Sequence, residues 1–258
     1  MVAQTFLSVL IHIALYHNIL KYAIISDVHA NLEAVEACFR QIDKLKADRI
    51  ICLGDLVDYC AEPNEVISII KNNCDIVLLG NHDEAQYNFS LSERFNERAR
   101  ASSVHTREVL KEINLEYIRS LPLTHSENGL LFAHASPSEP FSYKYVLNED
   151  SAVLNFNAFE EKICFIGHSH KPLIFENSRI GIKTISEGTL NNDCRYIINV
   201  GSVGQPRDGN NKLSFGLFDT ENNQYTNIRT DYDRSSASIK IYKEGLPVFL
   251  ASRILVGI

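Results

Sequence analysis

Short apolar runs recur in the first third of the chain, and segments with helical spacing lie between them. The run YAIIS at 22–26 shows no polar alternation, which is typical of a strand buried on both faces. Asn31 is suited to cap a helix in which apolar residues then recur every three or four positions. The runs RIICL at 49–53 and DIVLL at 75–79 repeat the strand pattern, and Pro63 suits the first turn of the helix between them. This order predicts right-handed crossovers and a parallel sheet.

The pattern changes in the second part of the chain. Residues 93–118 are rich in Glu, Arg and Leu and predict one or two helices. Segments that are typical of strands joined by short turns then follow at 129–135, 162–167, 172–176, 195–200, 213–219 and 225–232. This order favours an α/β protein of the α+β type, with a mixed sheet or two packed sheets and helices outside. No repeat or long linker interrupts it, so we expect residues 21–258 to form a single domain.

The first twenty residues differ from the rest because they are mostly apolar and carry no charged side chain. They lack the basic start and the small-residue cleavage site of a signal peptide. Polar residues such as His12 and Asn18 interrupt the ~20 apolar residues that a membrane span requires. We therefore expect residues 1–20 to be an N-terminal extension, either an added peripheral element or an over-extended start of the reading frame, and we expect no membrane association.

Charge and cysteine content narrow the function classes. The formal net charge is −7, from 25 basic and 32 acidic residues, which disfavours a partner such as duplex DNA, because clustered Lys and Arg supply most of that affinity. A small anionic substrate held by metal ions is compatible with this charge. The six cysteines form no C-x-x-C pair, so they indicate neither a disulfide framework nor a zinc ribbon. Reduced, buried thiols indicate a cytoplasmic protein.

Polar and ionisable residues follow five of the predicted strands. The segments are DVH at 27–29, GDLVD at 54–58, GNHD at 80–83, His134, and GHSH at 167–170. In parallel α/β sheets the carboxyl ends of the strands lie along one edge, where ligands bind. We therefore expect these side chains to converge.

The converging residues are donors suited to metal ions. They are Asp27, His29, Asp55, Asn81, His134, His168 and His170. Each would cost a few kcal/mol if it were buried without a partner, and divalent cations would satisfy all of them. The D-x-H and H-x-H spacings place side chains on one side of an extended strand, so each pair can reach one ion or two adjacent ions. Nitrogen and oxygen ligands without thiolate favour Mn, Fe or Zn, and this set does not distinguish among them.

These segments together resemble the signature motifs of the calcineurin-like metallophosphoesterases, over residues 22–230. GDLVDYCAEPNEVI and INVGSVGQPRDG are especially similar to the small bacterial and archaeal phosphoesterases of that superfamily. The resemblance implies two mixed β-sheets packed face to face and flanked by helices. Close relatives often have glycine where this chain has Asp58 and Cys60, so we expect the loop that follows Asp55 to differ in shape.

The resemblance also implies roles for the individual residues. It assigns one metal ion to Asp27, His29 and His170, a second ion to Asn81, His134 and His168, and a bridging position to Asp55. His82 would stay unligated and face the substrate. The implied function is hydrolysis of a phosphodiester or phosphomonoester by in-line attack of a metal-bridging hydroxide, with His82 assisting the leaving group. The partner would be a small phosphorylated substrate.

Two further residues and two alternative functions complete the expectations. A histidine in this role needs an acceptor on its other nitrogen, and the resemblance implies Asp58 as that carboxylate partner of His82, with Asp83 as the rival. Arg207 is either a contact to the substrate phosphate or a solvated loop arginine. The alternative functions are a catalytically weak, metal-binding scaffold for protein interactions, and a nuclease. The presence of His82 beside all seven donors favours an enzyme over a scaffold, and the acidic balance disfavours a nuclease.

Overall fold

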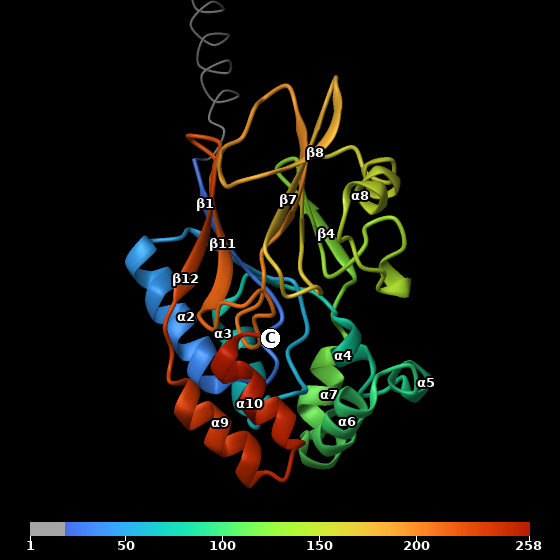
Figure 1. Ribbon diagram of the computed structural model, residues 1–258, viewed down its shortest axis with the longest axis vertical. Helices are drawn as coiled ribbons and strands as arrows, with labels where there is room; N and C mark the ends of the chain where they lie inside the picture. Colours follow the sequence, from blue (N-terminus) through green and yellow to red (C-terminus); the bar gives the residue numbers. More distant parts are fainter. Residues whose placement is uncertain (1–18) are drawn as a thin grey trace, which may run out of the picture.

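The computed structural model describes residues 19–258, so nearly all of the expected extension at 1–20 lies outside the described residues. Two six-stranded sheets lie face to face with helices around them (Figure 1). The first sheet contains β1 (Lys21–Ile25), β2 (Arg49–Cys52), β3 (Ile76–Val77), β9 (Gly188–Thr189), β11 (Leu213–Asp219) and β12 (Gln224–Thr230). The second contains β4 (Thr124–Glu127), β5 (Leu130–Ala133), β6 (Ile163–Ile166), β7 (Leu173–Ser178), β8 (Gly181–Ile185) and β10 (Arg195–Asn199).

Both sheets mix parallel and antiparallel strands. The order in the first sheet is β3-β2-β1-β11-β12-β9, and in the second sheet it is β4-β5-β6-β10-β7-β8. The pairs β1–β2, β2–β3, β5–β6 and β6–β10 are parallel, and the other pairs are antiparallel. The predicted sandwich of two mixed sheets is therefore confirmed.

Strand β1 is buried on both faces, as its unbroken apolar sequence predicts. Tyr22 and Ile24 point into the layer between the two sheets, where they join residues such as Phe132 and Phe165 of the second sheet. Ala23 and Ile25 point to the opposite face and pack against helices. Each large apolar side chain buried in this way contributes about 1.5–3 kcal/mol to stability.

The helices cover the outer faces of the sandwich and one of its ends. They are α2 (Leu32–Leu45), α3 (Pro63–Asn73), α4 (Asn81–Glu84), α5 (Phe89–Ser92), α6 (Glu97–Val109), α7 (Glu112–Arg119), α8 (Glu149–Phe156), α9 (Arg234–Lys243) and α10 (Val248–Val256), with a short 3₁₀ helix at Pro140–Ser142. Helices α2, α3, α9 and α10 share a core with the first sheet, and α8 packs on the second sheet. Within residues 19–258, no helix has the length and apolar character needed to cross a membrane.

Local sequence signals explain how the first two helices begin. The Oδ1 atom of Asn31 accepts a hydrogen bond from the backbone N–H of Ala34 at 3.2 Å, which caps α2. Pro63 lies in the first turn of α3, where its missing N–H costs nothing. All six cysteines are unpaired thiols, in agreement with the sequence.

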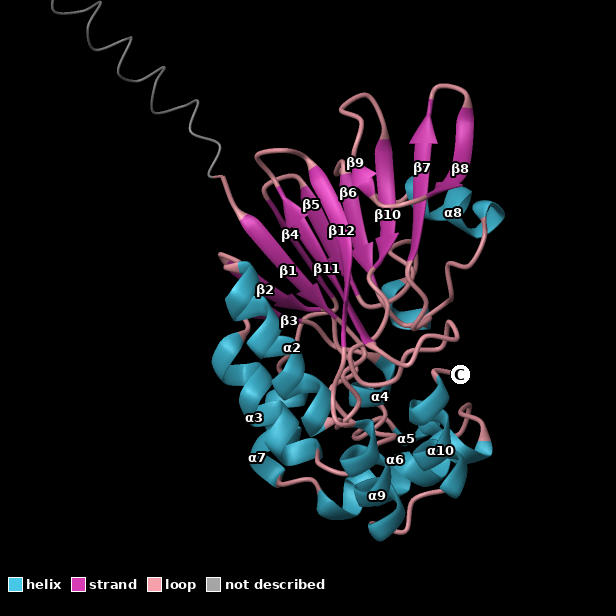
Figure 2. Ribbon diagram, turned by 60° about the vertical axis from the view of Figure 1, so that its left-hand side comes forward, coloured by secondary structure: helices cyan, strands magenta, loops and turns pink. Residues whose placement is uncertain are grey.

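The strand ends that matter for function lie together at one end of the sandwich. Strands β1, β2 and β3 of the first sheet and β5 and β6 of the second sheet all finish there, and α4, α6 and α10 lie beyond that end (Figure 2). The loops between these strands and helices therefore meet in one place.

Candidate metal centre

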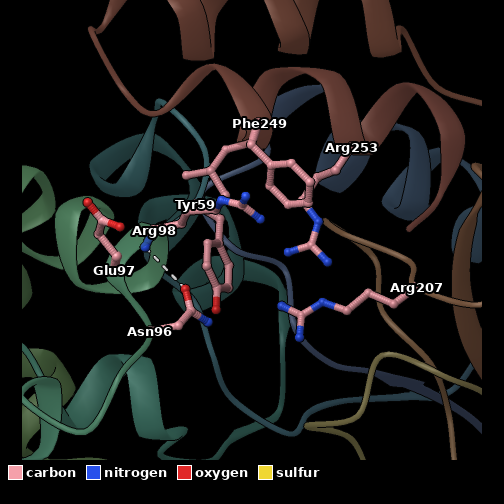
Figure 3. A pocket seen from close by; sticks show the side chains of 8 residues that line it. Tyr59, Asn96, Glu97, Arg98, Arg207, Phe249 and Arg253 are labelled. Carbon is pink, nitrogen blue, oxygen red and sulfur yellow. Dashed lines mark hydrogen bonds between the residues drawn. The ribbon is translucent and has the colours of Figure 1, made fainter.

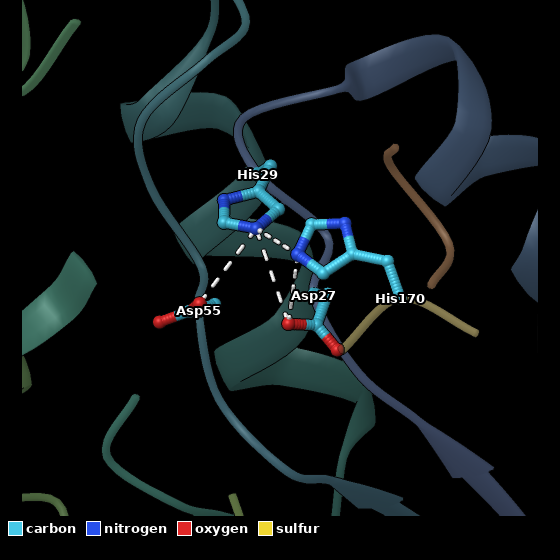
Figure 4. Close-up of side chains that lie close together, drawn as sticks. All are labelled: Asp27, His29, Asp55 and His170. Carbon is cyan, nitrogen blue, oxygen red and sulfur yellow. Dashed lines mark hydrogen bonds and ion pairs between the residues drawn. The ribbon is translucent and has the colours of Figure 1, made fainter. Parts of the chain in front are cut away.

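Two overlapping groups of donors lie at this meeting point of the loops. One contains Asp27, His29, Asp55 and His170 (Figure 4), and the other contains Asp55, His134 and His168. Within each group the candidate ligand atoms all lie within 4.8 Å of one another, and every residue is buried. Asp55 belongs to both groups, so its carboxylate lies between two candidate ion positions.

Hydrogen bonds on the outer nitrogens of His29 and His170 determine which atoms face the centre. The Nδ1 atoms lie 2.8 Å from the carbonyl oxygen of Val57 and 2.6 Å from that of Gln205. A carbonyl oxygen can only accept, so each Nδ1 carries the hydrogen. Burial lowers the pKa of both imidazoles, so both are neutral, and each Nε2 presents a lone pair to the centre.

These lone pairs face other acceptors, an arrangement that suits a cation. The two Nε2 atoms are 3.1 Å apart, and Nε2 of His170 lies 3.3 Å from Oδ1 of Asp27. This oxygen is buried and has no hydrogen-bond partner within residues 19–258. Three converging acceptors without a donor would be costly in a buried site, because each remains unsatisfied. A divalent cation bound by all three would remove that cost, so the residues present fit a metal ion.

The second group shows the same preference for positive charge. Nδ1 of His134 bonds to the carbonyl of Leu53 at 3.1 Å, and its Nε2 lies 3.3 Å from Oδ2 of Asp55 and 3.2 Å from Oδ1 of Asn81. Burial lowers the pKa of His134, but the carboxylates around it, Asp55 foremost, together raise it more, to about 9. A proton or a metal ion is therefore favoured here. Burial and then the charge of His134 lower the pKa of His168 to about 3, leaving a neutral imidazole.

The two aspartates are ionised and held by the backbone. Burial raises their pKa values, but the neighbouring histidines lower them more, so the net shift is below the usual range. Oδ2 of Asp27 accepts the N–H of His168 at 2.9 Å, and Oδ1 of Asp55 accepts the N–H of His82 at 2.8 Å. One oxygen of each carboxylate is thus fixed, and the other faces the centre.

The backbone around the donors is left-handed, which corrects one expectation. The residues Asp27, His29, Asp55, Asp58, His168 and His170 have φ between 47° and 69°. The explanation of the D-x-H and H-x-H spacings by extended strands is therefore wrong, because these residues lie in tight loops after the strands. A left-handed residue with a side chain costs about 1–2 kcal/mol, so strain is concentrated at this site.

Two glycines allow the loops to approach one another. A Cβ at Gly80 would overlap Oδ1 of Asp55, and a Cβ at Gly167 would overlap Oγ of Ser26 and lie 2.7 Å from Oδ2 of Asp27. The loops after β3 and β6 can therefore reach the aspartates only with glycine at these positions.

His82 lies beside the donors and is oriented by Asp58. Its Nδ1 is 2.7 Å from Oδ2 of Asp58, whose Oδ1 accepts a hydrogen bond of 3.0 Å from Nε2 of Gln86. The rival Asp83 instead accepts backbone N–H groups of Leu56 and Gly80, at 2.8 and 3.1 Å. Burial lowers the pKa of His82, but Asp55 and Asp58 raise it more, so the net shift is upward.

A cavity of about 170 Å³ opens over these groups. Four of the seven donors predicted from the sequence line this cavity together with His82 and Arg207, namely Asp55, Asn81, His168 and His170. The other three, Asp27, His29 and His134, lie beside these donors without lining the cavity. Three residues that contact the site were not predicted from the sequence. Gln86 follows His82 by four residues, a spacing that places both on one side of a helical turn and could have revealed it. Tyr59 and Tyr145, which pack on His82 and His168 at 4.6 and 4.1 Å between ring centres, gave no such signal.

Known proteins are similar to this chain over most of its length. A model of the calcineurin-like phosphoesterase superfamily domain matches residues 20–223. The chain is 38% identical over 243 residues to Uncharacterized protein MJ0912 of Methanocaldococcus jannaschii, which covers 91% of this chain and 97% of that protein.

Solved structures show the same similarity in three dimensions. A metallophosphoesterase from Sphaerobacter thermophilus has a TM-score of 0.82 and 35% identity, covering 93% of this chain and 100% of that chain. The hypothetical protein PH1004 of Pyrococcus horikoshii OT3, at 21% identity, shares the fold with a TM-score of 0.77 over 92% of this chain and 98% of that chain.

Proposed function

The chain belongs to the calcineurin-like phosphoesterase superfamily, and we propose that it is a cytoplasmic, two-metal hydrolase of small phosphoric esters. The observation that carries this proposal is the carboxylate of Asp55, which is shared by two groups of buried donors. The likeness to a structure described as a metallophosphoesterase supports it, as do the six unpaired cysteines for the cytoplasm.

In this proposal each group of donors holds one divalent ion. Asp27, His29 and His170 would hold one ion, Asn81, His134 and His168 the other, and Asp55 would bridge them. Mn, Fe or Zn suits this mixture of imidazole, carboxylate and amide. Such a pair of ions would supply a hydroxide nucleophile near neutral pH and offset charge on the phosphate. The backbone N–H groups that fix one oxygen of Asp27 and one of Asp55 would leave the other oxygen of each carboxylate free to hold an ion.

His82 would act on the leaving group. With Nδ1 bonded to Asp58, its Nε2 is the nitrogen available to donate a proton to the departing oxygen. The Asp58 carboxylate favours the protonated imidazole, and Gln86 holds Asp58 in place by a hydrogen bond. Asp58 is thus a positioning residue in this proposal.

Arg207 would bind the substrate. Its Nη2 donates to Oε1 of Gln205 at 2.7 Å, which holds the side chain, and the residue lines the cavity above the donors. A guanidinium can form paired hydrogen bonds to a phosphate. Contact with the substrate phosphate is therefore the role that we assign to it.

The variant His82→Ala tests the proposal. We expect it to keep both metal ions and to lose about 10²–10⁴-fold in kcat for butyl phosphate, because an alkoxide leaves poorly without a proton and this is the usual contribution of a general acid. p-Nitrophenyl phosphate and bis-p-nitrophenyl phosphate release a stable phenolate and should lose much less. Metal content by elemental analysis, phosphate release and nitrophenol release are measured on Mn²⁺-loaded protein. His125→Ala is the matched control, because His125 lies on β4 and bonds to Glu127; it should keep both metal ions and full activity.

Other outcomes point to specific alternatives. Equal losses of metal and activity in His82→Ala would make His82 a ligand. Wild-type protein that holds two metal ions but releases nitrophenol from neither substrate would favour the interaction scaffold. Faster cleavage of single-stranded DNA than of either ester would favour the nuclease.

A further inference from the structure

A second cavity, of about 400 Å³, adjoins the one above the donors. The two cavities share Tyr59, Asn96 and Arg207 in their walls. Figure 3 shows the guanidinium groups of Arg98, Arg207 and Arg253 directed toward the same space in front of Tyr59. They come from α6, from the loop after β10 and from α10, so the fold brings together cations that are far apart in the sequence.

These arginines lack Asp and Glu partners. None of the three forms an ion pair with an Asp or Glu side chain among residues 19–258, although Glu97 also lines the cavity. Nε of Arg253 donates to a backbone oxygen of Ile258, and Arg207 donates to Gln205, so each keeps terminal N–H groups for a ligand. Guanidiniums that converge on a cavity without Asp or Glu partners are suited to bind an anion.

Aromatic rings in the cavity wall are covered by cations. The guanidinium carbons of Arg98 and Arg253 lie 3.7 and 5.2 Å from the centre of the Phe249 ring, and that of Arg207 lies 5.4 Å from the Tyr59 ring. These cation–π contacts hold the arginines in place and occupy ring surface that a nucleobase would need for stacking. The cavity therefore favours an anionic group over an aromatic base.

Repulsion among the three arginines adds to the preference of the cavity for an anion. Burial, followed by repulsion from Arg207, lowers the pKa of Arg253 to about 10, well below the usual range of arginine. An anion placed among the three guanidiniums would offset that repulsion. The chain as a whole is acidic, with a net charge of −7, so this concentration of positive charge is local.

The position of the cavity identifies which part of a substrate it would hold. The ring of Tyr59 lies 4.6 Å from the ring of His82 and also lines the arginine cavity. In the proposed function His82 donates its proton to the leaving group. The leaving group would therefore depart past Tyr59 toward the arginines.

We infer that the cavity lined by Arg98, Arg207 and Arg253 binds a second phosphate carried on the leaving group, with Arg207, which lines both cavities, placed between the two phosphates. The preferred substrates are then small organic bisphosphates with a short linker between the two phosphates. This inference rests on the proposed function for the scissile phosphate, but the binding of an anion by the arginines does not depend on hydrolysis.

A binding experiment tests the anion site alone. Metal-free protein, prepared with EDTA, is titrated with inorganic pyrophosphate in a calorimeter. We expect binding that weakens about tenfold for each arginine changed in Arg98→Gln and Arg253→Gln, and about a hundredfold in the double variant, because each charge-assisted hydrogen bond is worth roughly one such factor. Arg100→Gln is the control, since Arg100 is exposed on the same helix and does not line the cavity. Binding that is absent, or equal in all variants, overturns the inference.

A kinetic experiment tests the substrate class. Mn²⁺-loaded protein is given butane-1,4-diol bisphosphate or butyl phosphate, and phosphate release is measured. We expect kcat/KM to be at least about tenfold higher for the bisphosphate, and the Arg98→Gln/Arg253→Gln variant to bring this ratio close to one. An unchanged ratio in that variant overturns the inference. Pyrophosphate binding that depends on the arginines, without hydrolysis of either ester, supports the anion site and contradicts the proposed hydrolase.

Discussion

A single hydrogen bond on the outer nitrogen of His29, and another on that of His170, would prepare both residues for the metal ion proposed above. Each Nδ1 donates to a backbone carbonyl, which directs the lone pair of Nε2 into the centre. Burial lowers the pKa of both residues, so no proton must leave them at neutral pH. At the scale of the residue, the chain therefore holds neutral ligands in the correct tautomer.

The pH dependence of turnover tests the pairing of His82 with Asp58. Burial lowers the pKa of His82 and the carboxylates of Asp55 and Asp58 raise it more. A general acid must be protonated, so activity is retained below this pKa and is lost as the pH rises through it. Asp58→Asn removes one carboxylate and lowers the pKa of His82. We expect the alkaline limb of a plot of kcat against pH to move to lower pH, with kcat at neutral pH reduced about tenfold.

The control for this variant is Asp193→Asn. Asp193 is exposed in the loop before β10, and its substitution should leave the pH profile unchanged. An alkaline limb at the same pH in Asp58→Asn and in the wild type would show that Asp58 does not set the protonation of His82.

At the scale of the element, strands with unbroken apolar sequences were predictable, and the short polar strand β4 was not. Strand β1 is buried on both sides, so its sequence is apolar throughout. Strand β4 has the sequence THSE at the edge of the second sheet, with two exposed and two half-buried side chains, so it carries no apolar pattern. Strand β3 was expected over 75–79 but spans only Ile76–Val77.

The candidate donors were predictable because each follows directly after a predictable strand. The arginine cavity was not, because Arg98 and Arg253 lie on helices whose local sequence says nothing about which loop they will face. Their meeting with Arg207 depends on how α6 and α10 pack at the end of the sandwich. That packing is a tertiary property, and no spacing along the chain encodes it.

Gly167, which directly follows β6, gives a prediction at the scale of the element. In Gly167→Ala, the added methyl group would overlap Ser26 and press against Asp27. We expect the free energy of unfolding to fall by about 1–3 kcal/mol, as is usual for overpacking, and metal binding to weaken because Asp27 is displaced. Chemical denaturation measures the first effect and metal titration the second.

Gly129→Ala is the matched control for this substitution. A Cβ at Gly129 meets no atom within 4 Å, although its φ of +75° makes alanine strained by about 1–2 kcal/mol. It should lose some stability and keep its metal affinity. Equal metal affinity in the two variants would contradict the role of Gly167.

At the scale of the whole molecule, the donors come from both sheets. Asp27, His29, Asp55 and Asn81 follow strands of the first sheet, and His134, His168 and His170 follow strands of the second. An ion bound by both sets would link the two layers directly. Metal binding should therefore stabilise the entire fold.

Thermal unfolding measures how much a bound metal ion stabilises the fold. At free Mn²⁺ about one hundred times the dissociation constant, one bound ion adds about 2.7 kcal/mol to the stability of the folded state. For a domain of this size, that should raise Tm by roughly 5–10 °C, and EDTA should reverse the change. Asp55→Asn should abolish most of the rise, because Asp55 belongs to both groups of donors. A Tm that does not respond to Mn²⁺ in the wild type would argue against the metal centre, whatever the activity.

The arginine cavity is built differently from the donor groups, with a consequence for how new specificities could arise. Loops that follow the strands and the first residue of α4 carry the donors, whereas α6 and α10 contribute Arg98 and Arg253. Substitutions on the sides of α6 and α10 that line the arginine cavity would therefore change that cavity and leave the seven donors and His82 unchanged. One catalytic end could in this way serve many different esters, with selectivity tuned from the helical side alone.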